Sequence, residues 1–336
     1  MKKIICIGSS TRDIFVTLLE TKIVDNANDI TAKKLMAFEF GAKEYADSFR
    51  EEVGGSAVNV AAGLISGGSR AFVFSRTSRG EIGKWILKRV SRLKIKKNYM
   101  QQRSKEESET SVIVSDKKNM DHVILRTGDS IEQFDLEKAI GKFREKVHWI
   151  FVASQKSNWQ ENWSKIKDFA QEKKAKIAIN PSGYQISNNP QELLQAISEA
   201  DIVFLNRDEA LELIQKSKGE VEDEISNLMK ELILGDEQAV VITDGENGAY
   251  VGNKKGVYFL KTSVEKKSDT VGAGDAFASG FLSSFIEDSE IKKALSWGMA
   301  NSSSVISKVG ATNGLLSGKE LKYAGNELIE KIEEVK

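Results

Sequence analysis

The most informative stretch of the chain is residues 268–285, SDTVGAGDAFASGFLSSF. Its Gly272, Ala273 and Gly274 permit a tight turn in which backbone N–H groups point the same way. We expect a helix over Ala273–Ile286, and the N-terminus of a helix carries partial positive charge. The stretch therefore predicts an anion-binding site at this turn, with Asp275 beside it.

Two roles are open for Asp275 on this pattern. A carboxylate at the start of a helix is a good N-cap. Beside a bound phosphate, it could equally act as a general base toward an attacking hydroxyl. A dinucleotide fingerprint is disfavoured because Phe277 occupies its sixth position, and Gly83-Lys84 and Gly318-Lys319 lack the Ser or Thr of a P-loop. A dinucleotide-dependent oxidoreductase is disfavoured for the same reason.

A second glycine-rich stretch lies at residues 51–68, EEVGGSAVNVAAGLISGG. Gly54 and Gly55 let a backbone approach a ligand closely, and Asn59 follows one turn into the expected helix Ala57–Ser66. An Asn side chain offers a donor and an acceptor, which suits sugar hydroxyls. A plain glycine turn before a closely packed helix explains the stretch equally well.

Strands and helices alternate along most of the chain, which predicts an α/β fold whose central sheet is mostly parallel and covered by helices on both faces. The expected strands are Lys3–Gly8, Ala71–Ser75, Trp149–Ala153, Lys176–Ile179, Ala200–Leu205 and Ala239–Thr243. The expected helices are Ala57–Ser66, Gly80–Leu93, Trp159–Lys173, Gln191–Glu199, Arg207–Gln215, Asp223–Leu234, Ala273–Ile286, Ile291–Ser307 and Lys319–Glu334.

Two stretches break this alternation. Residues 13–52 contain little helix, and ETSVIVSD and HVILR, within residues 109–126, read as two strands around a turn. Their alternating polarity predicts a small antiparallel sheet with one solvated face. We therefore expect a β lid from 13–52 and 108–127, and a large α/β domain from 1–12, 53–107 and 128–336. Unpaired lid edges predict a homodimer through the lid.

The composition limits the partners. The 336 residues carry 49 Lys+Arg and 49 Asp+Glu, so no basic surface is expected to gather nucleic acid. A single cysteine and two histidines argue against disulfides and against a cysteine- or histidine-rich metal site, and they favour a reducing compartment. No apolar run reaches the length of a membrane span. We expect a cytoplasmic protein without a membrane partner.

Together, GGSAVNVA and DTVGAGDAF resemble the paired signatures of the ribokinase-like (PfkB-type) carbohydrate kinase family. Four weaker matches occur in the family's order: GSSTRD at 8–13, LNRDEA at 205–210, TDGENGAYV at 243–251 and SKVGAT at 307–312. The resemblance implies a ribokinase-like three-layer α/β/α fold with a β lid. It also implies ATP-dependent transfer of a phosphoryl group to a hydroxyl, expected to be primary, of a small sugar or sugar-like molecule.

The resemblance also implies roles for residues on the acceptor side. Asp275 would be the catalytic base, and Gly272, Ala273 and Gly274 would form the anion hole for the transferring group. Asp13, Gly54, Gly55 and Asn59 would bind the hydroxyls of the substrate. Arg126, at the end of a lid strand, is a further candidate for substrate binding, although a solvated side chain is equally consistent with its position.

On the nucleotide side, the resemblance implies that ATP and Mg²⁺ are needed. Asn206 and Glu209 match an N-x-x-E motif, in which Glu209 would hold magnesium through water. Thr243, Gly245 and Gly248 would line the ATP site, with Asn301 near the adenine. Asp269 would help hold a monovalent cation such as K⁺ behind the anion hole.

The acceptor stays open, because two segments depart from the family pattern. AINPSGYQI at 178–186 lacks the Asp and Arg of a D-P-N-x-R segment, and SRTSRGEIG at 75–83 replaces a V-G-x-D-x-x-G turn. A sugar, a phosphorylated sugar or a nucleoside such as adenosine are all consistent with the remainder. A non-catalytic sugar- or nucleotide-binding regulator is the alternative outside enzymes, and the retained Asp275 argues against it.

Overall fold

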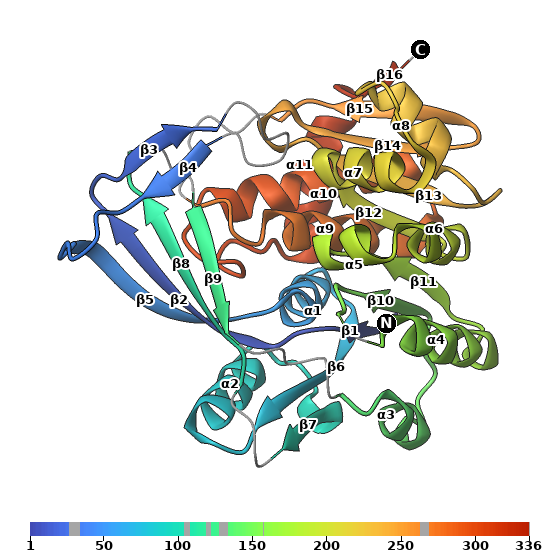
Figure 1. Cartoon of the computed structure of the whole chain (residues 1–336). Helices are drawn as coiled ribbons and strands as arrows, with labels where there is room; N and C mark the ends of the chain where they lie inside the picture. The colour runs from blue at the N-terminus through green and yellow to red at the C-terminus, as the bar shows by residue number, and fades with distance from the viewer. Residues whose placement is uncertain are drawn as a thin grey trace.

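A large, mostly parallel sheet forms the centre of the computed structural model, which describes residues 1–26, 34–103, 108–118, 122–127, 134–156, 158–262 and 269–335 (Figure 1). Strands β7, β6, β1, β10, β11, β12 and β13, neighbours in that order in the sheet, pair in parallel. Strands β14, β15 and β16 extend the sheet beyond β13 in antiparallel fashion. In sheet order the strands are β16 (Glu333–Val335), β15 (Gly256–Leu260), β14 (Ala249–Asn253), β13 (Ala239–Thr243), β12 (Ile202–Asn206), β11 (Lys176–Ile179), β10 (Trp149–Val152), β1 (Lys3–Ile7), β6 (Arg70–Ser78) and β7 (Met100–Arg103).

Helices cover both faces of this sheet, so the predicted three-layer α/β/α architecture is confirmed (Figure 1). One layer consists of α1 (Ser56–Ser66), α2 (Glu81–Arg92), α9 (Ala273–Asp288), α10 (Ile291–Ile306) and α11 (Gly318–Ile329). The other consists of α3 (Leu136–Lys142), α4 (Trp159–Lys173), α5 (Gly183–Asn188), α6 (Pro190–Ser198), α7 (Arg207–Lys218) and α8 (Ile225–Leu232). Short 3₁₀ turns occupy η1 (Lys97–Tyr99) and η2 (Gly245–Asn247).

The central strands are apolar on both sides because each side packs against a helical layer. Alternate residues of β1 belong to two different cores: Ile4 and Cys6 pack with one layer, and Ile5 and Ile7 with the other. All four are essentially inaccessible to solvent. This explains why the sequence of these strands shows continuous apolar runs.

A second, smaller sheet lies beside the main body, in the order β5 (Ala46–Gly54), β2 (Thr11–Leu18), β8 (Thr110–Asp116) and β9 (His122–Thr127) (Figure 1). The predicted antiparallel pair of 109–116 with 122–126 is present as β8 and β9. However, β2 pairs with β8 in parallel, so the small sheet is mixed. A separate ribbon joins β3 (Lys22–Asp25) to β4 (Lys34–Ala37). The division of the chain into a large domain and a lid stays a prediction.

The two faces of the small sheet have different surroundings. Residues paired directly across strands share a face, so Asp13, Ser111 and Arg126 point to one side together. This polar side faces the main body rather than the solvent. The opposite side is apolar, and it exposes 40% of Val123 and 57% of Leu125. The sheet therefore has one solvated face, as predicted, and the other face lines a cavity with the polar Asp13 and Arg126 together with the apolar Ile113 and Ile124.

The end of the chain also differs from expectation. The predicted helix Lys319–Glu334 ends at Ile329, and residues 333–335 form β16 on the open edge of β15. The Lys- and Glu-rich sequence favours a helix locally. Pairing with an unpaired strand edge overrides that preference, because the edge offers backbone hydrogen-bond partners that no local pattern reveals.

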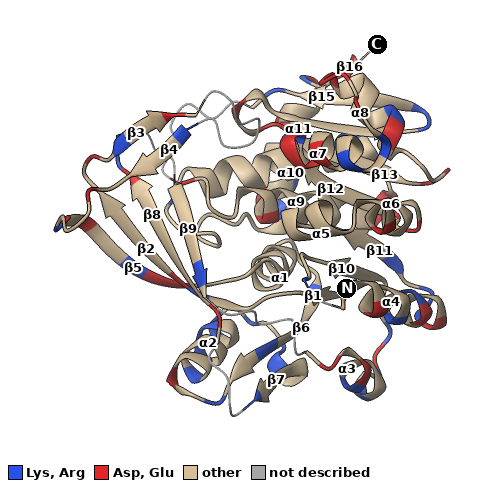
Figure 2. Ribbon diagram, in the orientation of Figure 1, with Lys and Arg blue, Asp and Glu red and all other residues tan. Residues whose placement is uncertain are grey.

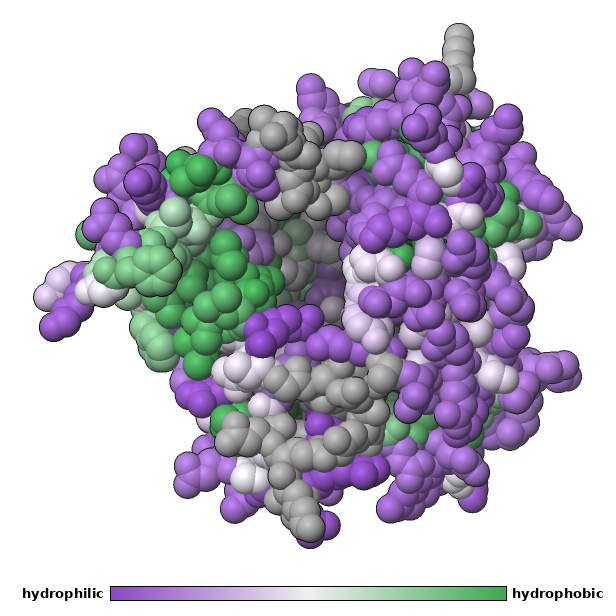
Figure 3. All heavy atoms as spheres, viewed as in Figure 1, coloured by the Kyte–Doolittle hydropathy of each residue, from purple (hydrophilic) through white to green (hydrophobic). Residues whose placement is uncertain are grey.

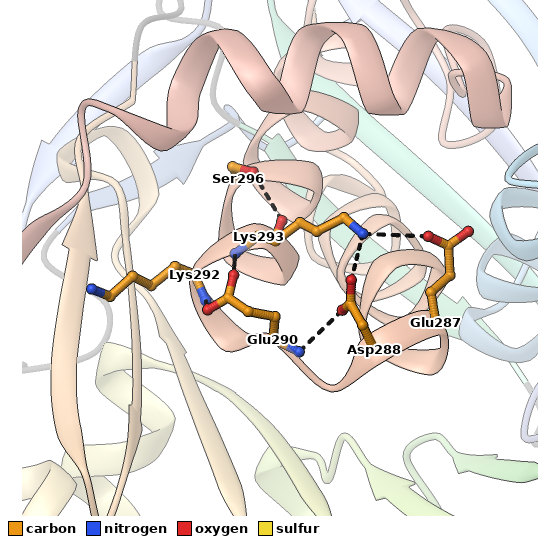
Figure 4. A network of polar contacts seen from close by, with 6 residues as sticks. All are labelled: Glu287, Asp288, Glu290, Lys292, Lys293 and Ser296. Carbon is orange, nitrogen blue, oxygen red and sulfur yellow. Dashed lines mark hydrogen bonds and ion pairs between the residues drawn. The ribbon is translucent and has the colours of Figure 1, made fainter.

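Charged side chains secure the junction between α9 and α10, at the end of α9 opposite Asp275 (Figure 4). Glu290 caps α10 by accepting from the backbone N–H groups of Lys292 at 3.1 Å and Lys293 at 2.7 Å. The Lys293 ammonium in turn lies 2.7 Å from Asp288. The junction lies between α9 and α10, and residues of both helices line a cavity described below.

Charges of both signs are scattered over the molecule rather than gathered on one face (Figure 2). Among the described helices, none is long and apolar enough to cross a membrane.

Candidate active site

The turn at Gly272 introduces α9 and has a backbone conformation that requires glycine. Gly272 is the N-cap residue of α9, with φ at 79°. A Cβ atom there would lie 2.4 Å from the Cβ of Ala311, so both the dihedral angle and the space exclude a larger residue. Gly274, by contrast, faces open space, since a Cβ there would meet no atom within 4 Å. The first turn of α9 thus presents its free N–H groups to an accessible cavity.

Asp269 ties this turn to the loop that follows α10. Its Oδ1 accepts from the Val271 N–H at 3.0 Å, and its Oδ2 accepts from the Gly310 N–H at 3.1 Å. The residue is 7% exposed. Both carboxylate oxygens therefore hold backbone in place. The assignment of a monovalent cation to Asp269 stays a prediction.

The Asp275 carboxylate points toward α1. Its Oδ2 accepts a hydrogen bond from Asn59 Nδ2 at 2.9 Å. Burial raises the pKa of Asp275, and hydrogen bonds from Asn59 and Ser56 oppose that rise. The N-cap of α9 is Gly272, so the capping role that the sequence left open for Asp275 is not the one observed. The carboxylate faces a cavity instead.

Asn59 leaves one polar atom for a ligand. The residue is 5% exposed, and its Oδ1 is buried without a hydrogen-bond partner among the described residues. A buried carbonyl oxygen without a partner is costly. A bound hydroxyl beside Asp275 would satisfy it.

Asp13 lies opposite Asp275, on β2 of the small sheet. Its Oδ1 accepts from Thr11 Oγ1 at 2.6 Å. Burial raises the pKa of Asp13 to about 6, while hydrogen bonds from Thr11 and Ser111 lower it. Gly54 makes room for this carboxylate, since a Cβ at position 54 would lie 1.8 Å from Asp13 Oδ2.

Arg126, on β9, is held by a buried carboxylate. Its Nε donates to Glu109 Oε1 at 2.9 Å, and its Nη2 donates to the same oxygen. The Glu109 side chain is 2% exposed, whereas that of Arg126 is 46% exposed. The sequence did not single out Glu109, because a lone Glu before a strand carries no motif.

One cavity gathers most of the predicted acceptor residues. It is lined by Asp13, Gly55, Asn59, Arg126, Gly272 and Asp275, together with Ser9, Thr11, Ser56, Ser111, Ile113, Ile124 and Val271. Two faces meet there: the polar side of the small sheet and the first turns of α1 and α9. Gly54 does not line the cavity and acts through Asp13.

A second cavity lies on the other side of the glycine turn. The predicted residues Asn206, Thr243, Gly245, Gly248, Ala273 and Gly274 line it, with Glu246, Ala249, Thr262, Thr270, Phe277, Met299, Ser302, Ser303 and Ile306. Gly272 borders the acceptor cavity, and Ala273 and Gly274 border this second one. The turn Gly272–Gly274 therefore borders both cavities.

Asn206 and Glu209 form a reciprocal cap at the start of α7. Asn206 Oδ1 accepts from the Glu209 N–H at 2.8 Å, and Glu209 Oε2 accepts from the Asn206 N–H at 2.9 Å. Burial raises the pKa of Glu209 to about 7. Among the described residues, no group of three or more His, Cys, Asp or Glu is placed to hold a metal. Asn206 lines the second cavity and Glu209 does not, so the magnesium contact through water assigned to Glu209 stays a prediction.

Asn301 does not line either cavity. It is 1% exposed, and its Nδ2 donates to the Ala276 carbonyl at 2.8 Å while its Oδ1 accepts from the Leu316 N–H at 3.0 Å. This geometry suits a helix-packing role, and the nucleotide contact assigned to Asn301 stays a prediction. The cavity wall is instead the adjacent face of α10: Met299, Ser302, Ser303 and Ile306. Their spacing of three, four and seven residues is the helical signal that could have found them.

Comparison with known proteins agrees with this fold. The model of the pfkB family carbohydrate kinases matches residues 1–317. An ATP-dependent 6-phosphofructokinase of Thermoanaerobacterium thermosaccharolyticum is 26% identical over 82% of this chain and 86% of its own. A 5-dehydro-2-deoxygluconokinase of Bacillus licheniformis is 33% identical over 37% of each chain. The structure of a Burkholderia thailandensis nucleoside kinase in complex with inosine matches with a TM-score of 0.75, at 19% identity, over 97% of this chain and 96% of that one.

The chain belongs to the pfkB family of carbohydrate kinases. It is an enzyme of the carbohydrate kinase class, with the ribokinase-like fold. The family does not by itself define the acceptor or the catalytic residues of this enzyme.

Proposed function

We propose that the protein transfers the γ-phosphoryl group of ATP to a primary hydroxyl of a small sugar or sugar-like acceptor. The carrying observation is that two cavities meet at the turn Gly272–Gly274, with the Asp275 carboxylate on one side and the open helix N-terminus on the other. A hydroxyl in the first cavity would lie next to a phosphate bound at the turn.

Asp275 is the proposed general base. A carboxylate whose pKa is raised by burial accepts a proton more readily than an ordinary aspartate, and Asn59 fixes its orientation through the 2.9 Å hydrogen bond. The glycine turn and the N-terminus of α9 would stabilise the charge on the transferring group. Asp13 and the unpartnered Asn59 Oδ1 would accept hydrogen bonds from other hydroxyls of the acceptor.

The second cavity is the proposed ATP site. Its apolar wall of Phe277, Met299 and Ile306 suits a base, and its glycine turns at Gly245 and Gly248, with Thr243, suit close backbone approach. Magnesium would neutralise phosphate charge when bound. Glu209 would hold it through water beside Asn206. A monovalent cation such as K⁺ would sit near Asp269.

The test of this function is Asp275→Asn in an ADP-release assay with a panel of sugars and nucleosides. We expect transfer to fall by roughly three orders of magnitude or more, because the base is lost while volume is kept. The matched control is Asp168→Asn, an exposed aspartate in α4. Circular dichroism should show both variants folded. Wild-type turnover in Asp275→Asn would disprove the base assignment.

A nucleoside kinase is the second candidate within the same chemistry. The acceptor cavity carries an apolar wall of Ile113, Ile124 and Val271, which a base or another flat ring could contact. The same panel separates the two candidates by their specificity constants. Ligand binding without any turnover would indicate the alternative outside enzymes, a regulatory relative.

A homodimer through the small sheet is the proposed assembly. The apolar outer face of that sheet is exposed, and β9 and β5 are open edges among the described strands. Figure 3 shows apolar side chains gathered over this part of the molecule. The buried free thiol of Cys6 fits the proposed cytoplasmic location.

A further inference from the structure

A third cavity lies between β7, at the edge of the main sheet, and helix α3. Its volume is about 510 Å³, and it is lined by residues 98–103 on one side and by Asp135, Lys138, Ala139 and Lys142 on the other. These residues do not line either of the other two cavities. A ligand bound here would therefore occupy a separate site.

The Gln101 side chain ties the two walls of this cavity together. Its Nε2 donates to the Asp135 carbonyl at 2.6 Å, and its Oε1 accepts from the Asp135 N–H at 3.0 Å. Asp135 in turn begins α3, because its Oδ1 accepts from the Lys138 N–H at 3.0 Å. The walls are thus held in place by hydrogen bonds within the protein.

Cationic side chains outnumber carboxylates on these walls. Arg103, Lys138 and Lys142 line the cavity, together with one carboxylate, that of Asp135. None of the three cationic side chains forms a hydrogen bond or an ion pair with a described residue. Figure 2 shows Lys and Arg positions on both β7 and α3. Three charges are therefore available to a ligand.

The other charges of α3 do not cancel this excess. Glu137, the second carboxylate in this part of the chain, lies 3.5 Å from Lys165 of α4 and does not line the cavity. Both the first and the last turn of α3 border the cavity, so the partial charges of the two helix ends offset each other. The 3₁₀ segment η1 is a single turn. The described walls thus carry a net positive charge.

The two lysines stand at positions that do not favour the helix itself. Lys138 and Lys142 are four residues apart, so they share one face of α3, and like charges at this spacing repel each other. Lys138 also lies in the first turn, where a cation is unfavourable because the N-terminal end of a helix is partially positive. A bound anion would relieve both effects.

The open edge of β7 adds a backbone donor. The Arg103 carbonyl accepts from the Arg79 N–H at 2.9 Å, on the β6 side of the strand. Successive residues of a strand direct their backbone groups to opposite sides, so the Gln102 N–H points away from β6. Strand β7 is the last described strand at this end of the sheet. The contact also brings Arg79, from the unusual stretch 75–83, next to Arg103.

We infer that the cavity between β7 and α3 binds a small molecule that carries a phosphate group. Arg and Lys side chains and free backbone N–H groups are the donors that phosphate takes, and all three kinds are present here. The cavity is larger than a phosphate ion needs, and its wall of Asn98 and Tyr99 would contact the remainder of the molecule. The inference does not depend on the proposed function.

The experiment is lysine acetylation of the full-length wild-type protein, read residue by residue by mass spectrometry, with pyrophosphate as the probe. At about 10 mM pyrophosphate we expect the acetylation rates of Lys138 and Lys142 to fall about fivefold, since a site of millimolar Kd is then nearly saturated. Lys84 and Lys88 are the internal control, because they are exposed, share the same spacing in α2 and do not line the cavity. Their rates should not change.

Sodium chloride at matched ionic strength separates binding from screening of charge. Chloride should leave the rates of Lys138 and Lys142 unchanged. Equal protection by chloride and by pyrophosphate would overturn the inference, as would the absence of any protection. Because no turnover is measured, either result leaves the proposed kinase function standing.

Arg103→Gln tests whether both walls take part. We expect the pyrophosphate concentration that gives half-protection of Lys138 and Lys142 to rise about tenfold, because a charged hydrogen bond is lost. Arg92→Gln, an exposed arginine in the last turn of α2, is the matched control and should leave this concentration unchanged. Circular dichroism checks that both variants fold. Unchanged half-protection in a folded Arg103→Gln variant would show that the two lysines alone attract the anion, and it would overturn the inferred site.

Discussion

Gly54 illustrates how a motif glycine can act through a neighbouring side chain. It lines no cavity, yet a Cβ at its position would lie 1.8 Å from Asp13 Oδ2 and 3.0 Å from Thr11 Oγ1. Its lack of a side chain is therefore what permits the Asp13 carboxylate to stand where it does. The pattern Gly54-Gly55 suggested close approach of a ligand, whereas the observed close approach at Gly54 is to a carboxylate.

Gly54→Ala should therefore impair acceptor binding and leave ATP binding intact. The added methyl displaces Asp13, so we expect KM for the acceptor to rise by about tenfold or more, as for loss of a charged hydrogen bond. Steady-state kinetics with each substrate varied in turn measure this. Gly141→Ala in α3 is the matched control, because a Cβ there meets no atom within 4 Å. Equal effects on both variants would contradict the explanation.

We expect the buried, ionised Asp13 carboxylate to lower the free energy of unfolding at neutral pH. Burial raises its pKa to about 6 in the folded state, from an ordinary value of 3.8. Between these values the folded state binds more protons than the unfolded state, so stability falls as pH rises through this window and stays reduced above it. The penalty amounts to at most about 3 kcal/mol.

We accordingly predict that Asp13→Asn unfolds at a higher temperature than wild type at pH 7.5, and that the difference shrinks toward pH 4. The same variant should bind the acceptor poorly. Thermal unfolding across pH, with Asp47→Asn on exposed β5 as control, tests the linkage. A lower melting temperature for Asp13→Asn at pH 7.5 would show that its hydrogen bonds outweigh the cost of burying its charge.

Among the elements, the loop after α10 connects the small sheet with the glycine turn. Asn313 Nδ2 donates to Glu52 Oε1, on β5, at 3.0 Å. Three residues earlier, Gly310 donates to Asp269, which also holds Val271. These contacts connect the small sheet with the glycine turn Gly272–Gly274 through protein residues alone.

Breaking that link should affect turnover more than nucleotide affinity. For Asn313→Ala we expect kcat to fall about fivefold, the equivalent of a hydrogen bond worth roughly 1 kcal/mol, with KM for ATP little changed. Asn227→Ala, a partly exposed asparagine in α8, is the control. If kcat is as high in Asn313→Ala as in the control, this loop does not couple the small sheet to the turn.

At the scale of elements, the sequence predicts the features that local patterns decide and not those that a tertiary neighbour decides. Buried strands such as β1, and helix α9 with its glycine turn, follow from local apolar runs and capping patterns. Three features did not follow. Strand β16 forms on a distant edge, the small sheet turns the side that carries Asp13 and Arg126 toward a cavity, and α10 lines the second cavity with the Ser302–Ser303 side rather than with Asn301. Each is decided by a tertiary neighbour.

At the scale of the molecule, a net charge of zero is compatible with binding an anion at one site. The 49 positive and 49 negative side chains are scattered over the structure, so no surface field is expected to attract a polyanion (Figure 2). In the proposed site, phosphate is held by backbone N–H groups and a helix terminus, which a count of side-chain charges does not record.

The outer face of the small sheet gives the last prediction, which concerns assembly. Phe49, Val123 and Leu125 lie on this face, exposed by 62%, 40% and 57%. An apolar sheet face of this kind gains free energy when a second copy covers it. In a two-fold dimer each residue occurs twice in the interface, so a single substitution counts double.

Leu125→Asp should therefore convert a dimer into a monomer. Sedimentation from about 1 to 100 µM protein measures this, with Leu234→Asp, an exposed leucine on the main body, as control. The acceptor cavity lies on the opposite face of β9, because Ile124 and Arg126 alternate with Leu125. Loss of the dimer with little change in KM for the acceptor would separate assembly from binding. A wild-type protein that sediments as a monomer throughout this range would contradict the proposed dimer.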